Sequence, residues 1–381
     1  MQIKRCIFIV LFSLYAQWSW ATLPIQYWQT ASGARVYFVE NHDLPILDIS
    51  VEFAAGSGMD SANQSGRASL VQHMLSLGAG GLTEDQIATA LADVGAQLKN
   101  HFDRDRAGIA LRTLSSERER KQALDILARI IQHPEFPQEV VLREKARIIA
   151  SIKESSTKPD YIGDRELMKM LYGDHPYGFN EMGEIESLNR LQRADLLTFY
   201  RSYYVAKNAV IAIMGDITRL EAAALAESLT GNLPADGAKT GIAPVSITAA
   251  GIKRIPHPAT QSHIQLAYPG LRRSDPDYFP LLVGNHILGG GGFVSRLMEE
   301  IRQKRGLAYS VYSFFSPYQE QGPFQIGLQT KKEQSEEALA LTHRVLKDFV
   351  AQGPTEDELT AAKQNIIGGF PLRIDSNSKI L

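Results

Sequence analysis

The sequence has almost no cysteine, since Cys6 is the only one among 381 residues. This excludes a disulfide framework and a zinc site built from several thiolates. The sequence also has little excess charge: 40 Lys and Arg against 42 Asp and Glu give a formal net charge of −2. That balance argues against an electrostatic affinity for nucleic acid. What remains is an ordinary globular composition, 44% hydrophobic and long enough for about two or three domains.

Long apolar runs are also lacking, and the one short run lies at the N-terminus. Lys4 and Arg5 precede an apolar stretch over residues 6–15, and Ser19-Trp20-Ala21 resembles a small-x-small cleavage site. The stretch is too short to cross a bilayer. We therefore predict that residues 1–21 are a secretory signal cleaved after Ala21, with an uncleaved anchor as the alternative. The mature chain would be periplasmic or secreted, without cysteine or membrane span, and with a net charge of −4 once Lys4 and Arg5 are removed.

Residues 66–78 are the most informative stretch, and their apolar residues predict a helix. Gly66 lies at its entry and Gly78 just past its exit, where helices tend to end. The residues that recur at three- and four-residue steps to form one apolar face are Leu70, Val71, Met74, Leu75 and Leu77. Ser69, Gln72 and His73 are spaced i, i+3 and i+4, so they share another side of the same helix.

This polar spacing is the one that an H-x-x-E-H zinc site uses, in which two His bind the metal and the Glu activates water. Here Ser69 and Gln72 stand where the first His and the Glu would be, and only His73 remains. A hydroxyl is a poor zinc ligand beside imidazole, and an amide cannot accept a proton from water. A packed or capped His73 without a metal is the simpler interpretation, and a metal role is the alternative.

The remaining segments predict an order of elements that occurs twice. In the first part, strands are expected at 35–40, 46–54, 96–101, 106–114 and 209–214, with helices at 66–78, 84–94, 115–131, 137–154, 164–171, 193–203 and 217–230. Residues 231–244 are rich in Gly, Pro, Ala and Thr and predict a linker. Beyond it, strands are expected at 252–255, 263–268, 308–315 and 324–329, with helices at 277–288, 293–305, 331–351 and 355–367. The repeated order predicts two similar α+β domains, residues 22–235 and 245–381.

The helix over 66–78 and its flanks resemble the motif helix of the insulinase/pitrilysin peptidases, in their small bacterial two-domain form. Further matching segments are Gly95-Ala96-Gln97-Leu98, Pro134-Glu135-Phe136-Pro137, His175-Pro176-Tyr177-Gly178, and residues 203–216 and 302–313. The resemblance covers essentially the whole mature chain. It implies two homologous α+β domains, each a mainly antiparallel sheet packed with helices. Family chains of this size usually continue beyond the position of Leu381, which is consistent with a truncated C-terminal domain or a fragment.

In the family, a third zinc ligand, a Glu, lies on a second helix, and the matching position here is Ala150 or Ser151. Neither side chain binds zinc well. We expect the nearby Glu144 to lie on a solvated face with Lys145 and Arg147 instead. The resemblance therefore implies a degenerate motif, Ser69, Gln72, His73 and Ser151, with no metal or other cofactor in this chain.

The second part of the chain keeps residues that the family uses on substrate. Arg302 and Tyr309 have the spacing of an Arg/Tyr pair that holds the substrate backbone and stabilises the transition-state oxygen. Arg offers a permanent forked donor and Tyr a directional hydroxyl, which suits that role. The alternative is a surface Arg favoured by a helix dipole and a half-buried strand Tyr.

Two other segments could contact a peptide. The run Gly289, Gly290, Gly291 and Gly292 lacks the pattern of a P-loop. It resembles the glycine-rich substrate-handling loop of noncatalytic subunits of mitochondrial processing peptidase, with a mobile linker as the alternative. The family also adds substrate as a strand to a sheet edge, here expected near Ala96, Gln97 and Leu98 within residues 96–102. The alternative is an edge that Lys99 and Arg104 protect against aggregation.

The sequence thus combines an erased metal site with a retained Arg/Tyr pair. The first hypothesis is a noncatalytic, substrate-binding subunit of a periplasmic zinc metallopeptidase, inactive alone and active as an endopeptidase only with a zinc-bearing partner in a heterodimer. The second is a peptide-binding or scaffold protein without a peptidase role. The third is an active zinc peptidase with substitute ligands.

Overall fold

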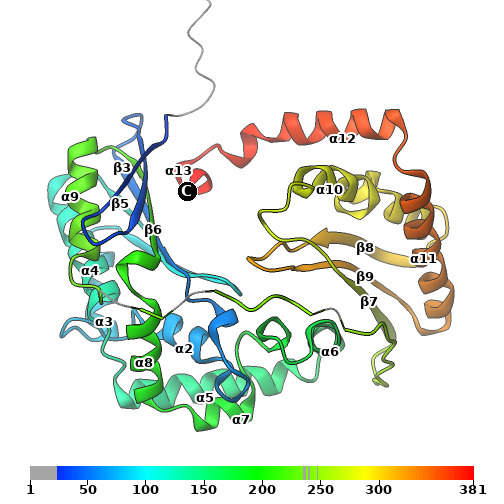
Figure 1. The fold of residues 1–381 in the computed structure, drawn as a ribbon, viewed down its shortest axis with the longest axis horizontal. Coiled ribbons are helices and arrows are strands. Elements are labelled where there is room, and N and C mark those ends of the chain that lie inside the picture. The colour runs from blue at the N-terminus through cyan, green and yellow to red at the C-terminus, as the bar shows by residue number, and fades with distance from the viewer. Residues whose placement is uncertain (1–23, 235–236, 239–240, 247) are drawn as a thin grey trace, which may run out of the picture.

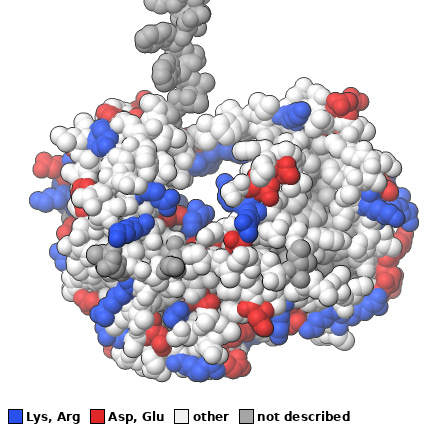
Figure 2. Space-filling model, viewed as in Figure 1, with Lys and Arg blue, Asp and Glu red and all other residues white. Residues whose placement is uncertain are grey.

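The computed structural model describes residues 24–234, 237–238, 241–246 and 248–381, so the predicted signal sequence lies outside the described residues. The described chain forms two α+β halves side by side (Figure 1). Figure 2 shows an opening between the halves, with charged side chains of both signs on its rim. Among the described residues, no helix is long and apolar enough to cross a membrane.

The N-terminal half is built on a six-stranded sheet with the order β1-β2-β6-β3-β5-β4. Its strands are β1 (Gln26–Gln29), β2 (Arg35–Glu40), β3 (Ile46–Phe53), β4 (Gln97–Phe102), β5 (Ala107–Leu114) and β6 (Ala209–Gly215). All neighbouring pairs are antiparallel except β2 and β6, which run parallel with Val36 opposite Ile211. The helices are α2 (Arg67–Met74), α3 (Glu84–Ala92), α4 (Glu117–Gln132), α5 (Gln138–Ser155), α6 (Pro159–Tyr172), α7 (Ile185–Arg190), α8 (Arg193–Tyr203) and α9 (Arg219–Thr230).

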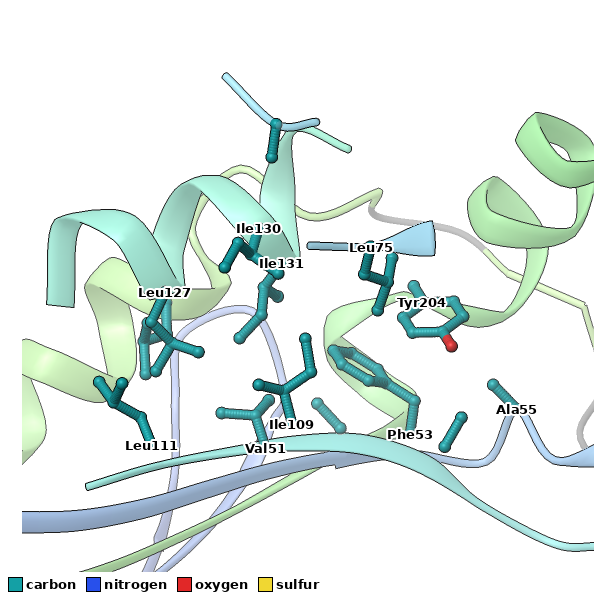
Figure 3. Packing of buried hydrophobic residues seen from close by; sticks show 14 of the residues in the cluster. Val51, Phe53, Ala55, Leu75, Ile109, Leu111, Leu127, Ile130, Ile131 and Tyr204 are labelled. Atoms are coloured by element: carbon teal, nitrogen blue, oxygen red, sulfur yellow. The ribbon is translucent and has the colours of Figure 1, made fainter. Parts of the chain in front are cut away.

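The main core lies between one face of this sheet and the helices that cover it (Figure 3). Val51 of β3 and Ile109 of β5 project from the sheet toward Ile130 of α4, because alternate strand residues share one face. Phe53 and Tyr204 close one end of the core, with ring centroids 4.8 Å apart. This packing fixes α2 and β5 relative to each other, which matters for the residues of the degenerate motif.

The C-terminal half repeats part of this plan in a three-stranded antiparallel sheet with the order β7-β9-β8. Its strands are β7 (Gln261–Pro269), β8 (Ala308–Phe315) and β9 (Pro323–Lys331), and its helices are α10 (Tyr278–Asn285), α11 (Ser335–Gln352), α12 (Glu356–Gly369) and α13 (Asn377–Ile380). The order β7-β9-β8 corresponds to β3-β5-β4 of the first half. The prediction of two α+β domains, each with a sheet and helices, is confirmed.

Some predicted elements differ in the structure. The strand predicted at 252–255 is wrong: these residues have no regular structure, and Ile252 is 82% exposed rather than packed. The helix predicted at 293–305 is confirmed only over residues 296–303, of which Met298–Gln303 form a π-helical turn. A separate 3₁₀ turn at Gly292–Val294 precedes it, after a first π turn at His286–Gly290. Strand β1 and helix α7 were not predicted from the sequence.

The predicted linker lies partly outside the described residues, and its described part packs against the N-terminal half. Ile242 is buried beside Met168 and Tyr177, and the Ala243 carbonyl lies 2.8 Å from His175 Nε2. The β8–β9 loop then joins the halves, because the Tyr172 hydroxyl donates to the Gln321 carbonyl at 3.0 Å.

The half-buried carboxylate of Asp105 completes this junction. Asp105 accepts one hydrogen bond from the Tyr177 hydroxyl at 2.7 Å and another from the Gln319 amide at 2.7 Å. Burial raises the pKa of Asp105, and the Tyr177 bond opposes that rise. The two halves are thus held together by specific hydrogen bonds at the loop between β8 and β9.

Candidate functional site

Helix α2 begins at a glycine that its surroundings require. Gly66 has φ +86°, and a Cβ there would lie 2.6 Å from the Met182 carbonyl oxygen. The buried Asp60 accepts hydrogen bonds from the amides of Gly66 (2.9 Å) and Ala68 (3.1 Å), which satisfies donors of the first helical turn. Burial raises the pKa of Asp60 to about 7, although Arg67 and these amides oppose the rise. The start of the motif helix is therefore fixed by its backbone.

Gln72 lies where the motif resemblance expects a catalytic Glu, and both ends of its amide are used internally. Its Nε2 donates to the Gly108 carbonyl of β5 at 2.6 Å, and its Oε1 accepts from the Tyr204 hydroxyl at 2.8 Å. The side chain is 2% exposed. A carboxylate could not donate to Gly108, so the amide suits this bridge. Gln72 connects α2 to the sheet and to the end of α8 and has no free group for acid–base chemistry.

His73 is paired with Glu144 of α5, whose carboxylate Oε2 lies 2.8 Å from His73 Nε2. Two guanidinium groups also donate to this carboxylate, Arg143 at 2.7 Å and Arg147 at 2.9 Å. Burial alone would raise the pKa of Glu144. The hydrogen bonds from His73, Arg143 and Arg147 outweigh it and lower the pKa to about 2. The carboxylate is ionised at neutral pH and saturated with donors.

The expectation of a solvated face at Glu144 and Lys145 is wrong. The Glu144 side chain is 1% exposed. Lys145 is also buried and donates to the Leu191 carbonyl at 2.6 Å. Both residues lie on the buried face of α5, which runs from Val141 to Ile152, and each forms hydrogen bonds there.

The remaining positions of the degenerate motif do not provide good zinc ligands. Ser69 is half-buried on α2, and Ala150 and Ser151 are exposed on α5. Within the described ranges, no group of three or more His, Cys, Asp and Glu is placed to hold a metal. A catalytic zinc normally has three protein ligands. Since Glu144 is already occupied by two cations, the donor set around His73 does not fit a zinc ion.

Residues predicted separately in the C-terminal half come together in one cluster. The guanidinium carbon of Arg302 lies 4.8 Å from the ring centroid of Phe293 and 4.9 Å from that of Tyr309. We call these three residues the Arg302 cluster. Tyr309 is 80% exposed, so the alternative of a half-buried tyrosine is wrong. Phe293, which the sequence analysis did not single out, follows the glycine run and is 63% exposed.

The glycine run is an ordered turn for steric reasons. A Cβ on Gly289 would lie 2.7 Å from the Ser313 amide nitrogen of β8, and one on Gly291 would lie 2.6 Å from the His286 carbonyl oxygen. Gly292 has φ +63°, which favours glycine. These positions need glycine for close backbone packing, so the run is no simple mobile linker.

Strand β4 is the last strand of its sheet, as the peptide-docking prediction requires. Lys99 is exposed on it. Arg104 is 7% exposed, and its Nε lies 3.3 Å from a Glu181 carboxylate oxygen while its guanidinium packs over the Tyr318 ring. The expectation that Arg104 guards this edge is therefore wrong, because its charge is turned inward.

Two family models match the chain, "Insulinase (Peptidase family M16)" over residues 35–183 and "Peptidase M16 inactive domain" over residues 190–366. A crystal structure described as a peptidase M16 inactive domain from Pseudomonas fluorescens superposes with a TM-score of 0.90. It is 40% identical and covers 94% of this chain, which in turn covers 85% of it. The chain belongs to the M16 (insulinase) peptidase family.

Curated M16 relatives carry different descriptions. The "Uncharacterized zinc protease YmxG" of Bacillus subtilis is 27% identical over 92% of this chain and 84% of its own length. The "Non-peptidase homolog YmxG" of Helicobacter pylori is 27% identical over 91% of this chain and 80% of its own. The mitochondrial-processing peptidase subunit beta of Blastocladiella emersonii is 23% identical over 92% and 76%. This M16 chain is thus similar to proteins described as a protease, as a non-peptidase homologue and as a subunit.

Proposed function

We propose that this M16 protein is a noncatalytic, peptide-binding subunit that acts with a zinc-bearing M16 partner in the periplasm. The observation that carries the proposal is the state of Glu144, the only carboxylate hydrogen-bonded to His73 among the described residues. Two arginines and the histidine use its acceptor positions, and Gln72 is locked into a structural bridge. The motif helix therefore keeps its place in the fold without the groups that would activate water.

The Arg302 cluster supports a role in binding rather than in metal chemistry. A guanidinium and an exposed hydroxyl can donate to a peptide carbonyl, and such donors stabilise negative charge as it develops on that oxygen. Because the described residues hold no group of three or more metal-ligating side chains, the zinc and its water would come from the partner. The peptide would lie along β4, where an added strand gains main-chain hydrogen bonds.

Reconstitution tests this proposal. The chain is co-expressed with a candidate zinc-bearing M16 protein, and peptide hydrolysis is compared for the partner alone, the pair, and pairs with altered Arg302 or Tyr309. Tyr309→Phe is expected to lower turnover about 10²-fold without preventing assembly, since one transition-state donor is lost. Arg302→Lys is also expected to be harmful, because a point charge does not replace a forked donor.

Tyr268→Phe serves as the matched control, since Tyr268 is a partly exposed tyrosine of the same half on β7. It is expected to leave turnover unchanged. A partner that is equally active alone, or pairs in which both Arg302 and Tyr309 variants match the wild type, would refute the proposal.

A peptide-binding or scaffold role without any peptidase partner is the second candidate. The Helicobacter pylori relative described as a non-peptidase homologue favours it. Under this hypothesis the chain binds peptides or proteins in the periplasm, but no zinc-bearing M16 protein co-purifies with it from the native host.

A further inference from the structure

Arg302 has a permanent charge with no acceptor among the described residues. Within that part of the chain, the guanidinium contacts two aromatic rings and forms no hydrogen bond and no ion pair to an acid. Phe293 and Tyr309 flank the guanidinium, each ring centroid within 5 Å of its carbon. Stacked rings contact the faces of a guanidinium and leave the N–H groups at its edge free. The free edge suits a planar oxyanion such as a carboxylate, which accepts two parallel hydrogen bonds.

An exposed apolar surface lies beside this edge. Phe293 is 63% exposed and the adjacent Val294 is 79% exposed. Their backbone is nevertheless anchored: Gln303 Nε2 donates to the Phe293 carbonyl at 2.8 Å, and the buried Ser295 hydroxyl donates to the Gly292 carbonyl at 2.7 Å. Two apolar side chains are thus held out toward solvent by an ordered turn, which lowers the entropic cost of binding an apolar group there.

The turn is also flanked by irregular helical segments. One π-helical turn, His286–Gly290, ends within the glycine run, and the other, Met298–Gln303, carries Arg302 itself. Such turns are uncommon and occur frequently at functional sites. Together, the free cationic edge, the apolar surface and the ordered turn describe a binding site.

We propose that the Arg302 cluster, with Val294, binds the C-terminal carboxylate of a peptide whose last side chain is bulky and apolar. The inference rests on the proposed function, in which Arg302 and Tyr309 hold the carbonyl at which the partner cuts. In that hydrolysis the water oxygen bonds to the carbonyl carbon, the C–N bond breaks, and the released amine takes up a proton. The same carbonyl carbon becomes the new C-terminal carboxylate, so donors placed for the reacting oxygen also retain the product.

Binding of labelled peptides to the purified chain, without a partner, tests this assignment by fluorescence anisotropy. Four peptides share one sequence and differ at the last residue: Phe acid, Phe amide, Ser acid, and Asp amide with a side-chain carboxylate. The Phe acid is expected to bind about tenfold or more tightly than each of the others, because it alone fills both parts of the site.

Three variants separate the two contributions. Arg302→Gln is expected to remove the preference for acid over amide, and Phe293→Ala the preference for Phe over Ser while the acid preference persists. Phe279→Ala is the matched control, because Phe279 is another exposed phenylalanine of the same half, on α10, and it should change neither preference. Thermal melts of all variants report whether each remains folded.

Equal binding of acid and amide, Asp amide binding as tightly as Phe acid, or an unchanged acid preference in Arg302→Gln would overturn the inference. Failure here is distinguishable from failure of the proposed function. If adding this chain does not raise the partner's turnover but the purified chain still prefers the Phe acid, only the proposed function is refuted. If the pair is active but the purified chain binds acid and amide equally, only this inference is refuted.

Discussion

Replacing Glu144 with Gln removes the negative charge at the centre of the His73 site while keeping the shape of the side chain. The folded-state pKa of about 2 lies below the ordinary value of 4.5. This difference corresponds to about 3 kcal/mol of stability at neutral pH, as each pKa unit is worth about 1.4 kcal/mol. The Arg143 and Arg147 side chains are 48% and 69% exposed, so water solvates part of their charge in the variant. We expect a loss of about 2–3 kcal/mol.

The stability that Glu144 contributes should depend on pH in a defined direction. Because folding depresses the pKa of Glu144, its contribution is fully present above pH 4.5 and is lost as the pH falls toward 2. Urea unfolding followed by circular dichroism should therefore show a lower midpoint for Glu144→Gln at pH 7. The difference from wild type should shrink steadily below pH 4.5.

Glu154→Gln on the same helix is the matched control, since Glu154 is 75% exposed and, among the described residues, its carboxylate pairs only with Lys158. Its free energy of unfolding should fall by less than about 1 kcal/mol, the usual contribution of a surface ion pair. If Glu144→Gln unfolds like this control, or if its deficit is independent of pH, then Glu144 is not the saturated, ionised group described here.

Further predictions concern the motif helix, the glycine turn and the edge strand. Gln72→Glu should cost about 3 kcal/mol in urea unfolding, because it removes the donor to the Gly108 carbonyl and buries a charge; an unchanged midpoint would contradict the bridge. Gly289→Ala should lower the melting temperature more than Gly292→Ala, since only the former forces a Cβ against β8, at a cost of about 1–3 kcal/mol. The reverse order would disprove the packing argument. Proline replacements along Gln97–Phe102 should weaken peptide binding without unfolding the domain, and unchanged affinity in all of them would place the peptide elsewhere.

Much of the fold could be predicted from the sequence because its signals are local. The helix expected over 66–78 is found as α2, Arg67–Met74, because apolar residues recur along it after Gly66, although it ends four residues earlier than expected. The strands expected at 263–268, 308–315 and 324–329 are also found, as β7, β8 and β9. The strand expected at 252–255 failed, because a strand needs a neighbour to pair with and Ile252 has none in the structure.

The partners of the site residues could not be predicted in the same way. Glu144 looks like a surface residue among charged neighbours, and only the spacing of Val141, Ile148 and Ile152 places it on the buried side of α5. Its pairing with His73 joins residues 71 positions apart, which no local pattern encodes. The contact of Phe293 with Arg302 likewise depends on how the glycine turn packs against β8.

The central claim is that this chain does not bind a catalytic zinc but still binds peptides. Elemental analysis of the purified chain tests it most directly. We predict no stoichiometric zinc in the wild type and no change in metal content for His73→Ala, because Glu144 is held by two arginines and Ser69 and Ser151 are weak ligands. About one zinc per chain, lost on His73→Ala, would contradict the account.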